Sequence, residues 1–156
     1  MVTTISEAIG RPASSNQQSE TGDSPQFARK SPQTRILVVD DEPLIRWSVA
    51  ETLGGLGCDV GEAGDAASAM RACAPGSRAV DVVLLDLRLP DCDDLGALTA
   101  IRRLSPRTLV ILMTAYGSPE LVLEAHRLGI FAILDKPFEI AALQPLVERA
   151  LDTRRC

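Results

Sequence analysis

Short apolar runs, nearly unbroken and rich in β-branched residues, recur along the chain from Arg35 onward. The first is Ile36 to Val39, and longer stretches of mixed polarity separate the later runs. Continuous apolar runs of this length are typical of parallel strands that are covered on both faces. We predict strands at residues 36–39, 80–85 and 108–113, and weaker ones at residues 59–62 and 131–134.

The stretches between these runs carry apolar residues at three- and four-residue spacing, which indicates helices with one buried face. Pro43 suits the first turn of a helix, and Gly57, Gly76 and Gly129 lie where a left-handed residue can close one. The predicted helices cover residues 44–56, 66–74, 95–104, 119–128 and 140–151.

Pro145 falls inside the last predicted helix. Because proline removes a hydrogen-bond donor and clashes with the preceding turn, it either kinks this helix or delays its start. The sequence leaves both outcomes open.

Strict alternation of strands and helices indicates one α/β domain, a doubly wound parallel sheet with right-handed crossovers. The chain has 156 residues, 46% of them hydrophobic, which is enough for one domain with a substantial core. We place this domain at residues 34–152 and treat residues 153–156 as a C-terminal extension. In such sheets, ligands bind beyond the carboxyl ends of the strands, where the strand order reverses.

Residues 1–33 are rich in Ser, Thr, Gln and Pro and show almost no apolar periodicity. A segment of this kind cannot offset its ordering entropy by burial, so we predict a disordered tail. The tail is either a passive extension, which includes a start codon set too far upstream, or a docking segment.

Charge and composition exclude several classes of function. A net charge of -5 without a block of Lys or Arg argues against direct DNA binding. No apolar run reaches the roughly 18 to 20 residues of a membrane span, and no signal peptide is recognisable, so we expect a soluble, cytoplasmic protein. The four cysteines show no metal-binding or redox spacing.

Polar residues end four of the predicted strands. The first strand runs into Asp40, Asp41 and Glu42, and the third ends at Asp86. The fourth ends at Thr114, and the fifth runs into Asp135, Lys136 and Pro137. One Asp after a strand is ordinarily a turn or a cap, but carboxylates, a hydroxyl and a lysine on one sheet edge indicate a site.

Clustered carboxylates repel one another unless a cation neutralises them. Mg²⁺ suits such a cluster because it prefers oxygen ligands and commonly binds through one or two carboxylates and a phosphate. An ionised Asp as acceptor, a metal, a lysine and a hydroxyl donor are the groups needed for phosphoryl transfer to a carboxylate.

Four segments, ILVVDDE, VVLLDLRLPD, LVILMTAYGS and LDKPF, resemble in order and spacing the signature segments of bacterial response-regulator receiver domains. The resemblance covers about residues 34–152 and implies a flavodoxin-like (βα)5 fold with strand order 2-1-3-4-5. The residues of these segments are most similar to those of receivers of the nitrogen-regulator type, which usually precede an ATPase and a DNA-binding module. With the sequence ending at Cys156, we expect either a stand-alone receiver without an output domain or part of a longer regulator.

The resemblance implies a role for each site residue. Asp86 would accept a phosphoryl group, and Thr114 and Lys136 would contact its oxygens. Asp40, Asp41, Asp86 and the main-chain carbonyl of Arg88 would hold Mg²⁺, and Lys136-Pro137 would be a cis peptide. The phosphodonor would be a sensor histidine kinase or a histidine phosphotransfer protein, and phosphorylation would switch a partner-binding surface or a dimer.

The sequence departs from the family pattern at several positions. Ile133 stands where receivers usually carry Tyr or Phe. In the family, this aromatic side chain swings inward as the site threonine moves toward the phosphate, and Ile133 puts that coupled movement in doubt. Asp91, Asp93 and Asp94 add negative charge beside the pocket, so we expect weaker attraction of anions. Trp47 is predicted to face solvent, either as an ordinary surface aromatic or as an anchor for the kinase.

Two other readings compete with a phosphorylated receiver. A pseudo-receiver would share the fold and work without phosphorylation, and Ile133 keeps that reading open. A hydrolase of the aspartyl-phosphate type would need a DxD loop and a cap insertion, for which the chain offers neither motif nor room. We expect self-phosphorylation and slow self-dephosphorylation rather than enzymatic turnover.

Overall fold

The computed structural model describes residues 34–93, 95–115 and 117–155. The predicted tail at residues 1–33, the charge of Asp94 and the terminal Cys156 lie outside the described residues.

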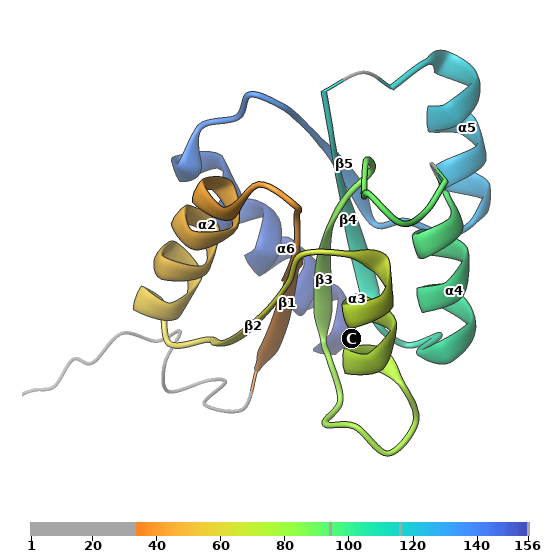
Figure 1. Ribbon diagram of the computed structural model, residues 1–156. Helices are drawn as coiled ribbons and strands as arrows, with labels where there is room; N and C mark the ends of the chain where they lie inside the picture. The colour runs from red at the N-terminus through yellow and green to blue at the C-terminus, as the bar shows by residue number, and fades with distance from the viewer. Residues whose placement is uncertain (1–33, 94, 116, 156) are drawn as a thin grey trace, which may run out of the picture.

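A parallel sheet of five strands forms the centre of the molecule, with strand order β2-β1-β3-β4-β5 (Figure 1). This confirms both the doubly wound sheet expected from the apolar runs and the strand order implied by the resemblance. Each strand begins and ends within two residues of its predicted bounds. The strands are β1 (Arg35–Val39), β2 (Asp59–Ala63), β3 (Val82–Asp86), β4 (Leu109–Thr114) and β5 (Ala132–Asp135).

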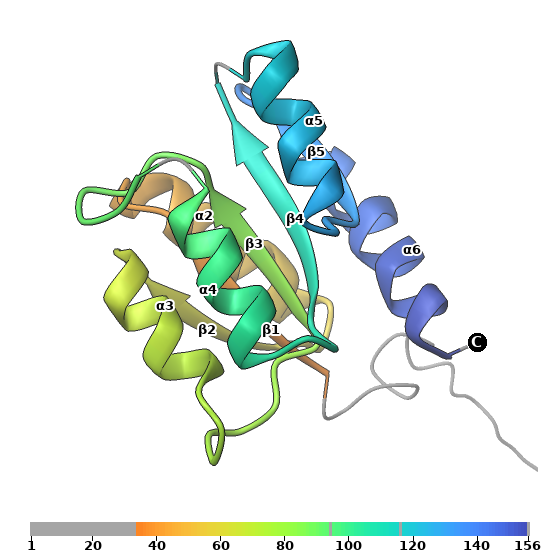
Figure 2. The same cartoon turned by 90° about the vertical axis from the view of Figure 1, so that its right-hand side faces the viewer.

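Helices cover both faces of the sheet (Figure 1 and Figure 2). On one face lie α3 (Ala66–Cys73), α4 (Gly96–Leu104) and α5 (Pro119–Arg127), which pack on side chains such as Leu37 and Leu85. On the other face lie α2 (Pro43–Gly55) and α6 (Leu143–Arg155), which pack on side chains such as Val38 and Leu84. Burial of both faces explains why the three central strands, β1, β3 and β4, consist of nearly continuous apolar runs.

Proline and two of the three glycines act as the sequence predicts. Pro43 opens α2, and Gly57 and Gly129, with φ of 92° and 90°, adopt the left-handed conformation that closes a helix. Gly76 also has a positive φ of 91°, but α3 already ends at Ala74 in an extended conformation, so Gly76 lies in the turn that follows and does not close the helix. Pro145 lies in the first turn of α6, so the delayed start is the outcome that occurs. A short 3-10 turn, η2 (Ile140–Ala142), precedes the helix.

The C-terminal end of α6 corrects one prediction. The helix continues to Arg155 instead of ending at residue 151, so residues 153–155 belong to it and do not form a separate extension. Arg154 forms an ion pair with Asp81 at 3.3 Å and donates a hydrogen bond to the carbonyl of Arg107. These contacts hold the last turn against the sheet.

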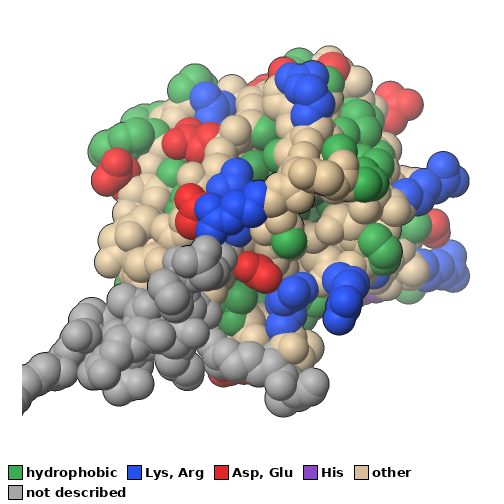
Figure 3. Space-filling model, turned by 90° about the horizontal axis from the view of Figure 1, so that it is seen from below, with side chains coloured by type: hydrophobic (Ala, Val, Ile, Leu, Met, Phe, Trp, Pro, Cys, Tyr) green, Lys and Arg blue, Asp and Glu red, His purple; other side chains and the backbone are tan. Residues whose placement is uncertain are grey.

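The amino ends of the strands form a network of paired charges. Asp59 forms ion pairs with Arg35 at 2.7 Å and with Arg78, and the main-chain N–H of Arg35 donates to Asp81 at 2.8 Å. Figure 3 views the molecule from this side and shows acidic and basic side chains next to one another. None of the helices in the described part of the chain is both long and apolar enough to cross a membrane.

Candidate functional site

The strand register brings the predicted residues to one edge of the sheet. Val39 at the end of β1 pairs with Leu85 on β3. Asp40 follows Val39 and Asp86 follows Leu85, so the two aspartates lie side by side at the carboxyl ends of these neighbouring strands. Thr114 ends β4 beside Asp135, directly before Lys136. The strand order reverses between β1 and β3, so these side chains lie at the switch point where open α/β sheets bind ligands.

Asp40 is the most deeply buried acidic side chain of this edge, with 0% exposure. Its Oδ1 accepts a hydrogen bond from the Glu42 N–H at 2.9 Å, and its Oδ2 accepts one from Lys136 Nζ at 2.8 Å. Both oxygens therefore have a fixed partner, which makes Asp40 a rigid member of the site.

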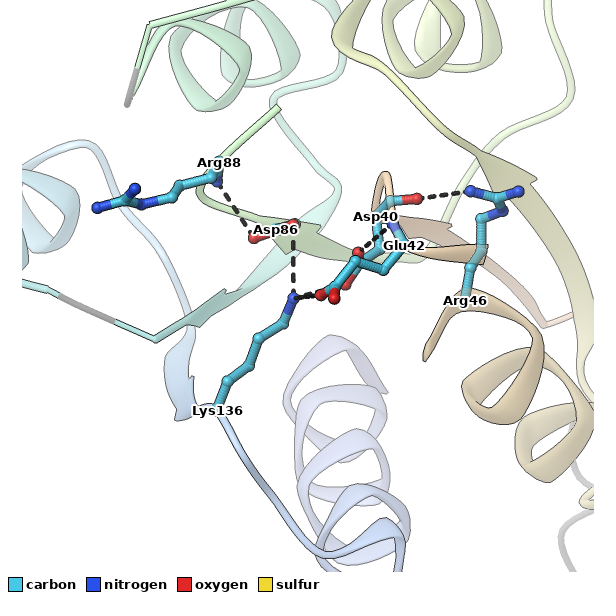
Figure 4. A network of polar contacts seen from close by, with 6 residues as sticks. All are labelled: Asp40, Glu42, Arg46, Asp86, Arg88 and Lys136. Carbon is cyan, nitrogen blue, oxygen red and sulfur yellow. Dashed lines mark hydrogen bonds and ion pairs between the residues drawn. The ribbon is translucent and has the colours of Figure 1, made fainter. Parts of the chain in front are cut away.

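Lys136 joins the two buried carboxylates (Figure 4). Its Nζ lies 2.8 Å from Asp40 Oδ2 and 3.4 Å from Asp86 Oδ2, and its main-chain N–H donates to the carbonyl of Thr114 at 2.7 Å. The Lys136-Pro137 peptide is cis, as predicted. The ammonium group is thus held from β4 and aimed at the space beside Asp86.

Asp86 is 6% exposed, and its Oδ1 accepts a hydrogen bond from the main-chain N–H of Arg88 at 3.1 Å. Burial raises the pKa of the Asp86 carboxyl above its ordinary value of 3.8, and the charge of Asp40 adds to this. The Arg88 N–H and Lys136 act in the opposite direction without cancelling the effect of burial. The ionised form of Asp86 therefore lacks enough positive charge around it.

Lys136 is affected in the complementary way. Burial alone would lower the pKa of its ammonium group, but the hydrogen bond with Asp40 and the charges of Asp40, Asp86 and Glu42 raise it above 10.5. Lys136 is therefore protonated at neutral pH and acts as a fixed cation. A single lysine does not balance the carboxylates around it.

The residues present fit a small hard cation. Oxygen atoms of Asp40, Asp41 and Asp86 lie within 4.8 Å of one another, and these carboxylates are the ligand type that Mg²⁺ prefers. Asp41 is exposed at the rim, which leaves room for the waters that Mg²⁺ retains. Burial and the charge of Asp40 raise the pKa of Asp86, and a cation bound beside it would favour the ionised form.

Thr114 and Arg88 both lie at the same end of the sheet as Asp86, and their roles stay predictions. Thr114 is buried at the end of β4, with 3% exposure, on the strand next to Asp86. Arg88 uses its N–H to bind Asp86, two residues earlier. Its carbonyl remains the expected additional metal contact.

Two further residues contact this site: Glu42, which follows β1 as expected, and Arg46 on α2, which no sequence motif indicated. Glu42 Oε1 lies 3.4 Å from Lys136 Nζ, and Arg46 Nη1 donates to the carbonyl of Asp40 at 2.7 Å (Figure 4). The sequence held one signal for Arg46, because Pro43 starts a helix whose first turns must pass the end of β1.

The loop after Asp86 differs in part from the expectation of added negative charge beside the pocket. Asp91 accepts hydrogen bonds from the N–H groups of Ala66 and Ala67, at 2.9 and 3.1 Å. Its carboxylate therefore caps the positive end of α3, where a negative charge is stabilising.

Trp47 and a neighbouring hollow mark the surface beside the site. Trp47 is 56% exposed on α2, as predicted. A hollow of about 680 Å³ opens next to Lys136, with the apolar side chains of Leu44, Phe138 and Ile140 in its wall. Ile133 is half-buried in β5 and packs against the core on the α3–α5 side.

Comparisons with known proteins agree on the fold. The family model described as "Response regulator receiver domain" matches residues 36–148. The crystal structure of a CheY-like receiver domain protein from Methanospirillum hungatei is 27% identical and superimposes with a TM-score of 0.74, covering 78% of this chain and 96% of that one.

Curated relatives are longer proteins. The regulatory protein AtoC of Escherichia coli is 39% identical over 117 residues, which is 75% of this chain and 25% of AtoC. The DNA-binding transcriptional regulator NtrC of the same organism is 37% identical over 116 residues, 74% of this chain and 24% of NtrC. The chain thus spans about a quarter of the length of these relatives.

Proposed function

The chain belongs to the response regulator receiver domain family, and on that premise we propose that Asp86 accepts a phosphoryl group and thereby switches a partner-binding surface. One observation carries the proposal. Asp86, buried at the switch point of the sheet, faces a lysine that is held by Asp40 and by the end of β4.

The transfer requires little covalent chemistry from the protein. An oxygen of Asp86 attacks the phosphorus of a phosphohistidine, and the new P–O bond forms as the P–N bond breaks. The imidazole leaves with the electron pair of that bond and with a proton on its ring. No general base is needed, because an ionised carboxylate is itself the nucleophile.

The surrounding residues position the acceptor and stabilise charge. The Arg88 N–H orients Asp86 through Oδ1, and Lys136 Nζ lies beside Oδ2, where oxygens of the phosphoryl group would gather. The Thr114 hydroxyl is our candidate for a further donor to these oxygens. Asp40, Asp41, Asp86 and the Arg88 carbonyl would hold Mg²⁺, which supplies the positive charge that neutralises the phosphoryl oxygens.

The partners we propose follow from this chemistry and from the family. A sensor histidine kinase or a histidine phosphotransfer protein would donate the phosphoryl group in the cytoplasm. The hollow beside Lys136, with its apolar wall, supports docking of a donor next to Asp86. We propose that an unidentified downstream protein, or a second copy of the chain, reads the phosphorylated state, and that the described domain makes no direct DNA contact.

The proposal is tested by incubating the protein with Mg²⁺ and acetyl phosphate and measuring its intact mass. We expect one added phosphoryl group, no addition without Mg²⁺, and none in Asp86→Asn. Asp81→Asn, at the opposite edge of the sheet, is the matched control and should be phosphorylated normally. Failure of the wild type to gain mass would contradict the assignment and favour the pseudo-receiver, whereas a gain that persists in Asp86→Asn would show that another residue is the acceptor.

A further inference from the structure

The guanidinium of Arg46 joins three elements at the carboxyl ends of the strands, which we call the carboxyl edge of the sheet. It reaches from α2, donates from Nη1 to the carbonyl of Asp40 at the end of β1, and donates from Nε to Glu62 Oε1 on β2 at 3.1 Å. It also packs on Gly64, where an added Cβ would lie only 3.2 Å from Nη1. With 22% of its side chain exposed, Arg46 is held in one place.

The carbonyl that Arg46 binds belongs to the peptide that links Asp40 to Asp41. Asp40 is fixed independently, by Lys136 and by the Glu42 N–H. Asp41 is exposed, and its carboxylate has no hydrogen bond or ion pair to any described residue, although it belongs to the acidic cluster. The direction of the Asp41 side chain therefore depends on the plane of the preceding peptide.

We propose that Arg46 is a positioning residue that sets the direction of Asp41 for cation binding, and that Glu62 orients Arg46 in turn. This inference rests on the proposed function, since it concerns the Mg²⁺ that the acidic cluster would hold. Groups that orient metal ligands from behind typically change metal affinity by about 10- to 100-fold when they are removed.

Charge alone predicts the opposite effect. Arg46 brings a positive charge close to the acidic cluster, which opposes a second cation, and Glu62 offsets that charge only in part. Replacing Arg46 by a neutral residue would tighten Mg²⁺ binding if electrostatics decided, and weaken it if positioning decides. The sign of the change therefore separates the two roles.

The experiment measures Mg²⁺ affinity by titration calorimetry at pH 7.5 without a phosphodonor. We expect Arg46→Met to raise the Kd about 10-fold, Arg46→Lys to raise it less, and Glu62→Gln to raise it least. Arg127→Met is the matched control, because Arg127 also pairs with a glutamate, Glu124 on α5, but far along the chain from the cluster.

A second readout separates positioning from general stability. The rate of phosphorylation by acetyl phosphate is followed against Mg²⁺ concentration for the same proteins. We expect half-saturation of Arg46→Met to move to about 10-fold higher Mg²⁺, with the rate at saturating Mg²⁺ restored. Urea denaturation confirms that each variant is folded under the titration conditions, and Arg46→Lys carries the test if Arg46→Met does not fold.

Two failures can be told apart. An unchanged or tighter Kd in the Arg46 variants, with Mg²⁺ binding by the wild type intact, overturns the role of Arg46 alone. Absence of Mg²⁺ binding by the wild type overturns the proposed function and this inference with it.

Discussion

Aspartates have opposite roles at the two ends of the parallel strands, the amino ends (the amino edge) and the carboxyl ends (the carboxyl edge). At the amino edge, Asp59 pairs with two arginines, and Asp81 pairs with Arg154 and the Arg35 N–H. At the carboxyl edge, the cluster of Asp40, Asp41 and Asp86 has Lys136 as its fixed cation. Carboxylates matched by fixed partners stabilise the fold, whereas an unmatched cluster is suited to bind a cation and a phosphoryl group from outside.

The largest expected effect comes from removing the fixed cation of the carboxyl edge. We expect Lys136→Met to slow phosphorylation of Asp86 by about 100-fold, the usual effect of losing one donor to developing negative charge. Arg154→Met removes a cation of the amino edge and should leave the rate unchanged. Mass spectrometry of timed reactions measures both, and equal losses in the two variants would contradict the contrast between the edges.

At the amino edge the large effect is on stability. We expect Asp81→Ala to lower the free energy of unfolding by about 2 kcal/mol, because the part-buried Arg35 N–H loses its acceptor. Urea denaturation measures the change, and phosphorylation should continue at the normal rate. Loss of phosphorylation in a folded Asp81→Ala would show that the edges do not act independently.

In contrast to Asp81→Ala, Asp86→Asn should raise the free energy of unfolding. Because the folded state raises the pKa of Asp86 mainly by burial, the protonated form is favoured there, and the ionised carboxylate costs free energy at neutral pH. We expect Asp86→Asn to be more stable by roughly 1 kcal/mol at pH 7 without Mg²⁺. The gain should shrink as the pH falls through the raised pKa and vanish below the ordinary value of 3.8, which applies to the unfolded chain.

Urea denaturation of both proteins across this pH range gives the measurement. Added Mg²⁺ should stabilise the wild type and narrow the difference, since it binds the ionised cluster. A variant that is less stable than the wild type at pH 7 would mean that Asp86 is matched by its surroundings, like the carboxylates of the amino edge.

The smallest expected effect concerns a carboxylate near the carboxyl edge that already has partners. Asp91 caps α3, so Asp91→Ala should lower stability by about 0.5 kcal/mol. Mg²⁺ affinity should not change. Thermal unfolding and Mg²⁺ titration test this, and a clear loss of Mg²⁺ affinity would place Asp91 with the cluster.

Much of the fold could be predicted because its signals are local. Apolar runs located β1, β3 and β4, weaker patterns located β2 and β5, and Pro43, Gly57 and Gly129 located helix ends. The end of α6 was wrong because the contacts of Arg154, with Asp81 and the Arg107 carbonyl, come from distant segments. The choice between a kink and a delayed start at Pro145 also depended on packing that no local pattern records.

The same contrast between local signals and contacts from distant segments explains how much of the candidate site could be predicted. Asp40, Asp86, Thr114 and Lys136 each follow or end an apolar run, so the topology alone brings them to one edge. The partners of those residues were harder to find. Arg46 binds a main-chain carbonyl, which leaves no trace in the sequence.

The ion pair between Asp40 and Lys136 spans 96 positions of the chain. A ribosome makes Asp40 and Asp86 well before it makes β5 and Lys136, so an emerging chain displays the acidic residues without their fixed cation. Until β5 has paired, such a chain lacks the lysine that we propose to speed phosphorylation of Asp86. A kinase that phosphorylates this site would therefore act best on chains in which the last strand has already paired.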